Sequence, residues 1–348
     1  MPYVGPRELA ERRQKSSARK PQIFPRFPNW QKCCDHFLRS LEARSGSVGT
    51  RTTYEGTLRA FFQDGKRPDK YTQAEVLDFI DSPTNSPRSR GKPPMPGTRN
   101  NRLVRLKSFY GFAGSYEISF RGGFRPLCQR DPTRGIDLIA EGEVYKGMEM
   151  HEIQAFFAAI PRDTPVGLRD FALFSFFWWS ARRLNEVVRL RSCDIEPWVF
   201  ENGHAGWRYH FTGKGKSRTR DAAELHPSAW DALSAYWCAT DRLPLPSNAP
   251  LFAATKTSDR HRPLSARAVD QRFHTYARLA GIEGRGYTVH SFRWSAAYER
   301  FRRNGYNIVK IKELLRHENI DTTYRYLRRR QQEADTDAEL LLADFGHL

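Results

Sequence analysis

The sequence predicts a mainly α-helical protein with one small β-sheet, divided between an all-helical N-terminal domain and a mixed α/β second domain. Apolar residues recur at helical spacing through most of residues 27–115. Over residues 192–224 the pattern changes. It predicts a strand, an Asn202-Gly203 turn and a second strand, as in a hairpin or small sheet. The length of 348 residues corresponds to two domains of about 150 residues each.

Several helices are expected in the N-terminal domain. The one over residues 72–81 has a clear start, because Thr72 is followed three residues later by Glu75, as in a capping box. The next, over residues 98–113, has an apolar side and a basic side. Two earlier helices are indicated by apolar residues at helical spacing, the first by Trp30, Cys34, Phe37 and Leu41 and the second by Tyr54, Leu58, Phe61 and Phe62. The apolar side of the helix over 98–113 carries Leu103, Leu106, Phe109 and Tyr110.

Basic residues gather between and on these helices. Residues 82–97 form a loop rich in Pro, Ser and Gly that also carries cations. A positive surface of this kind fits the phosphates of nucleic acid. The residues predicted to bind DNA in this domain are Arg88, Arg90, Lys92, Arg99, Arg102, Arg105 and Lys107.

The composition changes along the chain and divides it into five segments. The stretch between the two domains lacks a sustained period and contains Gly122-Gly123 and Asp131-Pro132, which favour turns. The predicted segments are a flexible basic arm (1–24), a helical domain (25–118), a linker (119–146), a second domain (147–330) and a C-terminal tail (331–348).

The second domain is expected to pack helices around the small sheet. Its longest apolar run, residues 171–181, is too short to span a bilayer, which needs about 20 residues. The predicted helices lie at residues 149–160, 168–180, 184–190, 228–239, 265–279, 291–303, 308–316 and 320–328.

The C-terminal tail turns acidic and carries one apolar stripe. Ala338, Leu341, Leu342 and Phe345 fall at i, i+3, i+4 and i+7, as on one side of a short helix. Such a helix is marginal alone in water and needs a docking surface, either on its own domain or on a neighbouring protomer.

The charge balance points to a polyanionic partner. Lys plus Arg number 57 and Asp plus Glu 39, a formal net charge of +18, while an aromatic content of 13% excludes a long disordered polyelectrolyte. Nucleic acid fits better than a membrane surface, because no long basic amphipathic helix or lipidation signal is present. The five cysteines form no C-x-x-C pair and no secretory signal is seen. We expect a cytoplasmic, nucleoid-associated protein without a metal or cofactor.

Some polar residues of the second domain stand out by their surroundings. Arg183 follows a long apolar stretch, where an arginine needs an anionic partner. His290 and Arg293 lie three apart at a helix start, so they share a face that favours an anion. The GKGKSR turn at 213–218 does not fit a Walker motif. Taken singly, each has an ordinary explanation as a solvated helix face or a turn.

Together and in order, these residues resemble the tyrosine recombinase (phage integrase) family. The resemblance covers residues 147–330, and the helical domain is less specifically similar to the family's core-binding domain. The positions that match the family's boxes are Arg183, Glu186, Leu190 and Asp194; Gly213-Lys214-Gly215; His290 and Arg293; Leu314-Leu315-Arg316-His317; and Tyr326, nine residues after His317.

Two departures from the family's pattern leave rivals for the matched residues. Ala181-Arg182 stands where Gly-Leu is common, so Arg182 rivals Arg183, although the offsets of the following Glu and Leu favour Arg183. Trp294 stands where His is frequent, and we expect only packing to change.

Rivals also lie near the matched lysine and tyrosine. Lys216 and Arg218 are close to Lys214, and we expect them to bind DNA. Tyr324 rivals Tyr326 but breaks the nine-residue spacing, and two residues apart on a helix the two side chains face differently.

The resemblance implies DNA strand cleavage by covalent catalysis. The oxygen of Tyr326 attacks a phosphodiester, which leaves a 3′-phosphotyrosine and a free 5′-hydroxyl. The bond energy is kept in the adduct, so neither ATP nor a metal is required. Lys214 protonates the leaving 5′ oxygen.

The other matched residues have implied roles around the phosphate. Arg183 and Arg293 offer forked donors to the charge of the transition state. His290 is the base that assists the tyrosine, and His317 binds the phosphate. Glu186 is a supporting residue that orients an arginine.

The resulting hypothesis is a site-specific DNA recombinase that integrates, excises or resolves a mobile element. A type IB topoisomerase-like relaxation activity and a non-catalytic DNA-binding regulator are the alternatives. The complete residue set favours an enzyme, and the G-K-G turn favours a recombinase. The expected partners are double-stranded DNA with inverted-repeat sites and a homotetramer on synapsed DNA, with no membrane partner; a need for accessory DNA-bending proteins is left open.

Overall fold

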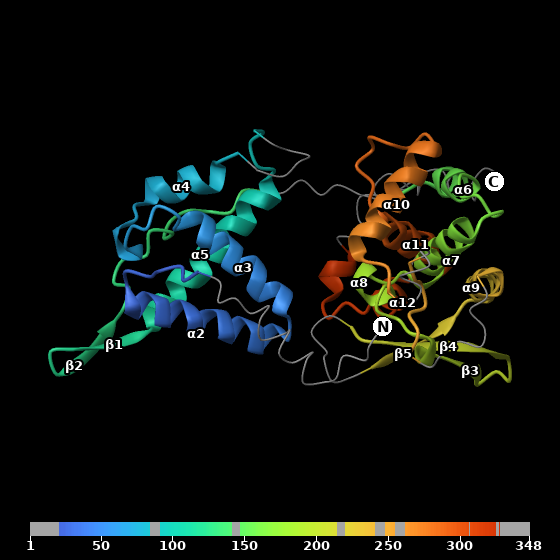
Figure 1. Cartoon of the computed structure of the whole chain (residues 1–348), viewed down its shortest axis with the longest axis horizontal. Coiled ribbons are helices and arrows are strands. Elements are labelled where there is room, and N and C mark those ends of the chain that lie inside the picture. The colour runs from blue at the N-terminus through green and yellow to red at the C-terminus, as the bar shows by residue number, and fades with distance from the viewer. Residues whose placement is uncertain are drawn as a thin grey trace, which may run out of the picture. The chain divides into compact units, whose positions relative to one another are not determined.

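The computed structural model describes residues 21–83, 91–140, 147–213, 220–240, 248–254, 262–305, 307–324 and 327. The chain divides into two compact units, Met1–Gly142 and Glu143–Leu348 (Figure 1). Helices dominate both units and the strands form two small antiparallel sheets, so the predicted fold class is confirmed. Within the described ranges, a helix with the length and hydropathy needed to cross a bilayer is absent.

The N-terminal unit is built on long helices that follow the predicted apolar periods. The capping box at Thr72 is present, since its Oγ1 accepts from Glu75 N at 3.3 Å and Glu75 Oε2 accepts from Thr72 N at 2.7 Å. The last helix starts two residues earlier than predicted because Pro96 suits the first helical position. The helices are α2 (Pro28–Ser45), α3 (Val48–Phe61), α4 (Gln73–Asp81) and α5 (Pro96–Ser115), with a 3₁₀ turn η1 (Pro68–Lys70).

Aromatic rings fill the core of this unit. Phe109 of α5 lies at its centre, with the ring centroids of Phe24, Phe37 and Phe62 at 6.0, 5.6 and 5.6 Å. Such offset and edge-to-face contacts add to the burial of apolar area. This packing places α3, α4 and α5 against one another and fixes the surface that carries the predicted DNA-binding arginines.

Residues 117–140, most of which were predicted to be linker, are folded onto the N-terminal unit. Strands β1 (Glu117–Phe120) and β2 (Gly123–Pro126) pair as a hairpin, and Arg121 and Gly122 supply the positive φ angles of its two-residue turn. The chain that follows buries apolar residues in the core and exchanges two hydrogen bonds between Asn100 and the backbone of Ile139. Tertiary contacts, rather than a periodic pattern, order this segment.

The second unit surrounds a three-stranded antiparallel sheet of order β3-β4-β5 with helices. The Asn202-Gly203 turn joins β3 and β4 as predicted, with Gly203 at φ 76°. The strands are β3 (Ile195–Val199), β4 (Ala205–Phe211) and β5 (Asp221–Leu225). The helices are α6 (Met150–Ala158), α7 (Pro165–Ser180), α8 (Leu184–Val187), α9 (Pro227–Ala239), α10 (Ala266–Leu279), α11 (Val289–Arg303) and α12 (Ile308–Leu315), with a 3₁₀ turn η2 (Ser192–Asp194).

The apolar helix α7 runs through the core of the second unit. It packs against α9 and α11 (Figure 1). A separate small cluster joins the end of α7 to α11 and α12, and it includes Ala181, Ala296, Leu315 and Leu327. Helix α11 starts two residues earlier than predicted, because Thr288 and Ser291 form a reciprocal N-terminal cap. His290 therefore lies inside the first turn of α11.

Candidate active site

Arg293 of α11 joins two segments that are far apart in the sequence. Its side chain is 1% exposed. Nη1 donates to the carbonyl of Ala181 at 2.5 Å and Nη2 donates to the carbonyl of Leu315 at 2.6 Å. Both carbonyls lie at helix C-terminal ends, which lack intrahelical partners and favour a cation. Arg293 thus holds the start of the first family box beside the segment that ends in His317.

His317 lies next to Arg293, and each of its ring nitrogens has a hydrogen-bond partner. Nε2 lies 3.3 Å from Nη2 of Arg293, and Nδ1 lies 2.9 Å from Oγ1 of Thr323. A guanidinium only donates, so Nε2 is an acceptor and the proton of the neutral ring sits on Nδ1, directed at Thr323. Thr323 is fully buried, so the contact fixes the orientation of the ring.

The pKa of His317 reports the surrounding charge. Burial lowers this pKa from the ordinary 6.5 to about 4, and interactions with Arg293, Arg183 and His290 act in the same direction. The structure therefore brings together four of the predicted catalytic residues in one electrostatic environment. A buried histidine among cations is suited to an anionic ligand, which would offset their repulsion.

Arg183 is oriented by Glu186, as the first box implies. Glu186 Oε2 accepts from the backbone N of Arg183 at 2.9 Å, and Oε1 pairs with Nη1 of the same residue at 3.1 Å. Glu186 is 7% exposed at its side chain, whereas that of Arg183 is 32% exposed. The carboxylate is thus committed to the arginine, while part of the guanidinium remains accessible to a ligand.

Arg182, the rival of Arg183, points to the sheet instead. It is 5% exposed, its Nε donates to the hydroxyl of Tyr209 at 3.0 Å, and its guanidinium carbon lies 4.2 Å from the ring centroid of Phe211. These contacts are structural, because a buried guanidinium needs an acceptor and gains from an aromatic face. The charge that acts on His317 is that of Arg183.

Two residues in the left-handed region set the directions of these boxes. Ala181 ends α7 at φ 53° and Arg316 ends α12 at φ 50°. Ala181 stands where the resemblance places glycine, the residue that adopts this conformation without steric penalty, and Arg316 has the same backbone conformation. The chain therefore turns at each helix end, two residues before Arg183 and directly before His317.

The start of β5 is held by two ion pairs. Arg316 Nη1 lies 2.7 Å from Asp221 Oδ1 at the start of β5. The preceding Arg220 pairs with Asp194, the last residue of the first box. Lys214, Lys216 and Arg218, which were predicted in the turn at 213–218, lie outside the described residues.

Tyr326 also lies outside the described residues. Two described residues lie close to it in the sequence. Thr323 is bonded to His317, and Leu327 is 1% exposed in the cluster of α11 and α12. Tyr324, its rival, is 47% exposed. Thr323, three residues before Tyr326 in the sequence, is therefore bonded to the site, a role that was not predicted from the sequence.

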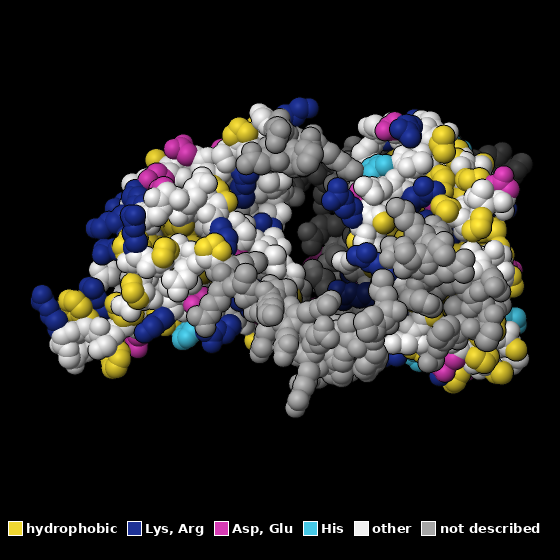
Figure 2. Space-filling model, viewed as in Figure 1, with side chains coloured by type: hydrophobic (Ala, Val, Ile, Leu, Met, Phe, Trp, Pro, Cys, Tyr) yellow, Lys and Arg dark blue, Asp and Glu magenta, His cyan; other side chains and the backbone are white. Residues whose placement is uncertain are grey.

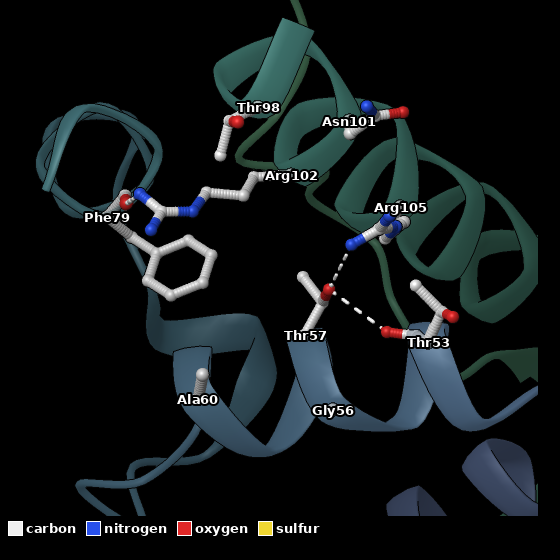
Figure 3. A pocket seen from close by; sticks show the side chains of 9 residues that line it. All are labelled: Thr53, Gly56, Thr57, Ala60, Phe79, Thr98, Asn101, Arg102 and Arg105. Atoms are coloured by element: carbon white, nitrogen blue, oxygen red, sulfur yellow. Dashed lines mark hydrogen bonds between the residues drawn. The ribbon is translucent and has the colours of Figure 1, made fainter. Parts of the chain in front are cut away.

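In the N-terminal unit, the predicted DNA-binding arginines of α5 have partners within the protein. Arg99 pairs with Asp81 at 2.8 Å, and Arg102 Nη1 donates to the carbonyl of Ser82 at 2.7 Å, just past the end of α4. Arg105 donates to Thr57 at 3.0 Å, and these side chains line a cavity of about 380 Å³ between α3, α4 and α5 (Figure 3). Lys92 is exposed and Lys107 half-buried, while Arg88 and Arg90 lie outside the described residues.

A second basic surface in this unit was missed by the sequence analysis. Figure 2 shows Lys and Arg side chains gathered at the end of the unit that carries the β1–β2 hairpin. A cleft of about 780 Å³ there is lined by five cations, Arg26, Arg67, Lys70, Arg125 and Arg130, and one carboxylate, Asp69. Those residues are scattered over three segments, so no local run of charge could have indicated them.

Comparison with known proteins identifies the family of the chain. The profile of the Phage integrase family matches residues 146–333, more than half of the chain. The chain belongs to the phage integrase family. The recombinase is similar to a tyrosine recombinase of Synechococcus elongatus, with 27% identity over 309 residues that cover 84% of this chain and 89% of that protein. It is also 35% identical to the tyrosine recombinase XerC of Xylella fastidiosa over 172 residues, 49% of this chain and 52% of that protein.

Solved structures share the fold of the recombinase. The XerH site-specific recombinase bound to its palindromic difH substrate superposes with a TM-score of 0.63 at 16% identity, over 92% of this chain and 91% of that one. A lambda integrase tetramer bound to a Holliday junction gives a TM-score of 0.56 at 15% identity, over 90% and 86% of the chains. The protein is a tyrosine recombinase, an enzyme that cleaves and rejoins DNA at specific sites.

Proposed function

We propose that the recombinase cuts each DNA strand through a 3′-phosphotyrosine at Tyr326. The observation that carries this proposal is the convergence of Arg183, His290 and Arg293 around the buried His317, to which Thr323, three residues before Tyr326 in the sequence, is bonded. Hydrogen-bond donors outnumber carboxylates in this group. It therefore suits a phosphodiester, whose negative charge grows in the transition state.

In the proposed step, a bond forms between the Tyr326 oxygen and phosphorus as the bond from phosphorus to the 5′ oxygen breaks. His290 takes the phenol proton, which matters because a tyrosine of pKa about 10 is a poor nucleophile at neutral pH. Lys214 gives a proton to the leaving 5′ oxygen. A 5′-hydroxyl from the partner strand then reverses the step and restores the tyrosine, so no energy source is consumed.

The arginines and His317 bind the phosphate in this proposal. Arg183 is held by Glu186 with part of its guanidinium accessible, and Arg293 is held by two backbone carbonyls, so both are oriented before the substrate arrives. Preorganised donors of this kind typically contribute 10²–10³ in rate each. A bound phosphate offsets the cations that lower the pKa of His317 and so favours its protonation.

The proposed substrate is double-stranded DNA with inverted-repeat sites, bound by a homotetramer. The fold likeness to XerH bound to difH and to a lambda integrase tetramer on a Holliday junction supports this assembly. The helical domain over residues 25–118 would bind DNA through Arg88, Arg90, Lys92, Lys107 and the α5 arginines, and the second domain would add Lys216 and Arg218. The reaction fits integration, excision or resolution of a mobile element.

A nicked suicide substrate that loses its 5′-hydroxyl fragment after cleavage tests this function. The expected result is a covalent protein–DNA adduct on DNA that carries the element's inverted repeats, and none on DNA without them. A non-catalytic regulator would bind and form no adduct. Relaxation of supercoiled DNA that lacks the repeats would instead identify a type IB topoisomerase-like activity.

A further inference from the structure

The C-terminal end of α7 is held by an arginine from another helix. The last four carbonyls of an α-helix have no intrahelical partner and favour a nearby cation, but α7 has no basic residue in its own last turn. Arg300 of α11 supplies the charge instead. Its Nη2 donates to the carbonyl of Trp179 at 2.5 Å, and its Nη1 donates to the carbonyl of Trp178 at 3.4 Å.

Arg300 makes these contacts in surroundings that are unfavourable for a charge. The residue is half-buried, and burial lowers the pKa of its guanidinium, as do the charges of Arg182 and Arg303. Among the residues that the structure describes, its acceptors are the two α7 carbonyls and that of Ala296 in α11. A guanidinium taken out of water needs such acceptors, so the end of α7 is what compensates the burial of Arg300.

A second arginine of α11 binds the same end of α7. Arg293 lies seven positions before Arg300, about two helical turns, so both side chains leave α11 on the same side. Arg293 donates to the carbonyl of Ala181 at 2.5 Å, two residues beyond the Trp179 carbonyl that Arg300 binds. Helix α11 therefore holds the end of α7 at two points, one on each side of Ser180.

The segment held in this way leads directly into the first family box. Ala181 turns the chain at φ 53°, and Arg183 follows two residues later as the N-cap of α8. Glu186 bonds to both the backbone N and the guanidinium of Arg183, so it fixes the side chain relative to its own backbone. The end of α7 connects this local unit to Arg293 and hence to the rest of the site.

We propose that Arg300 is a positioning residue that fixes the end of α7 and thereby places the Arg183 guanidinium for the phosphate. This inference rests on the proposed function, in which Arg183 binds that phosphate. Arg300 does not touch the reacting atoms, because its guanidinium is taken up by carbonyls of α7 and α11. It acts through the backbone that joins Trp179 to Arg183.

A double-mutant cycle with Arg183 tests this inference, and the rate of adduct formation on the nicked suicide substrate is the readout. Arg300→Met removes the charge and the forked donors and keeps an unbranched stem. If Arg300 acts through Arg183, its loss has no further effect in the Arg183→Ala background, whereas general damage to the fold slows cleavage in both backgrounds alike. Each variant is assayed well below its own unfolding temperature, so that unfolded protein does not contribute.

Arg300→Met should slow cleavage by about 10- to 100-fold when Arg183 is present, the effect of a displacement of about 1 Å. In the Arg183→Ala background the same change should cost less than about twofold. Arg300→Lys keeps a cation at the helix end but loses the fork, so its rate should fall between those of Arg300→Met and wild type. It replaces Arg300→Met in the cycle if that variant does not fold.

Arg303→Ala is the matched control. Arg303 is an arginine of the same helix, 70% exposed at its side chain and paired with Glu299, and Arg303→Ala should cleave at the wild-type rate.

Two results overturn the inference. One is wild-type cleavage by Arg300→Met. The other is a comparable loss in both backgrounds, which would make Arg300 a general stabiliser of the fold. In both cases the proposed function stands if Arg183→Ala alone is slow. If Arg183→Ala alone cleaves at the wild-type rate, the assignment of Arg183 fails and the inference fails with it.

Discussion

Nη2 of Arg293 lies 3.3 Å from Nε2 of His317, so residues of two motifs 24 positions apart are in contact. The contact settles which nitrogen of the histidine carries the proton, because arginine has no acceptor to offer. The pKa of His317 therefore depends on the charges of the site.

Tyr326→Phe should abolish the covalent adduct and leave DNA binding nearly intact. The substitution removes only the attacking oxygen, and Tyr326 has the family's spacing from His317. Denaturing gel electrophoresis of the suicide-substrate reaction measures the adduct. Tyr324→Phe is the control, since Tyr324 is 47% exposed and should retain adduct formation. Adduct from Tyr326→Phe together with none from Tyr324→Phe would refute the assignment.

Arg183→Lys and Arg182→Lys should fail in different ways. Arg183→Lys keeps a charge beside Glu186 but loses the forked donor, so we expect cleavage to fall by about 10²–10³ with little change in thermal stability. Arg182→Lys loses the bond to Tyr209 and the stacking on Phe211, and should destabilise the fold by about 1–3 kcal/mol. Cleavage rates and thermal unfolding of both variants decide the matter; the reversed pattern would make Arg182 the catalytic arginine.

His317 should make stability depend on pH between 6.5 and 4. Burial and the neighbouring cations lower its pKa to about 4, so the unfolded chain binds the proton more tightly than the native state. The stabilisation by neutral His317 is complete above pH 6.5 and is lost as pH falls toward 4. The loss amounts to at most about 3 kcal/mol.

Urea unfolding of wild type and His317→Gln at pH 7.5, 6, 5 and 4.5 measures this effect. Other titrating groups are common to both proteins, so the difference between their unfolding free energies isolates the histidine. That difference should shrink as the pH falls. A difference that stays constant across the range would contradict the lowered pKa.

DNA affinity should depend strongly on salt. The net charge is +18, and each phosphate neutralised contributes about −0.9 to the slope of log K against log salt concentration. We expect a slope of −3 or steeper, the order expected for a protein that neutralises several phosphates. Fluorescence anisotropy of labelled DNA, measured at salt concentrations from about 50 to about 300 mM, gives the slope. A shallower value would be inconsistent with a protein that neutralises several phosphates.

Deletion of residues 334–348 should spare binding to a single site and weaken synapsis and recombination. The tail lies outside the described residues, and its apolar stripe at Ala338, Leu341, Leu342 and Phe345 predicts a docking helix. We expect a monomer in free solution and a tetramer on paired sites, with the tail passed between protomers. Light scattering with and without DNA measures assembly. Full recombination by the truncated protein would show that the tail docks on its own domain or not at all.

The helices, the capping box at Thr72 and the strand–turn–strand at Asn202-Gly203 were predictable from the sequence, and so were the family's motifs. These features depend on side-chain periodicity and on hydrogen bonds between residues a few positions apart. The spacing of Arg183 from Glu186 belongs to the same class, because a short helix brings the two side chains together.

Only the tertiary structure decided how the cations are used. Arg182 and Arg183 are adjacent, yet one packs on Tyr209 and the other acts on His317, because distant elements supply the acceptors. The α5 arginines bond to α3 and α4 for the same reason. Arg316 forms an ion pair with Asp221, which lies 95 residues earlier in the sequence. Burial and long-range partners set the pKa and direction of a charged side chain, and neither is encoded in local spacing.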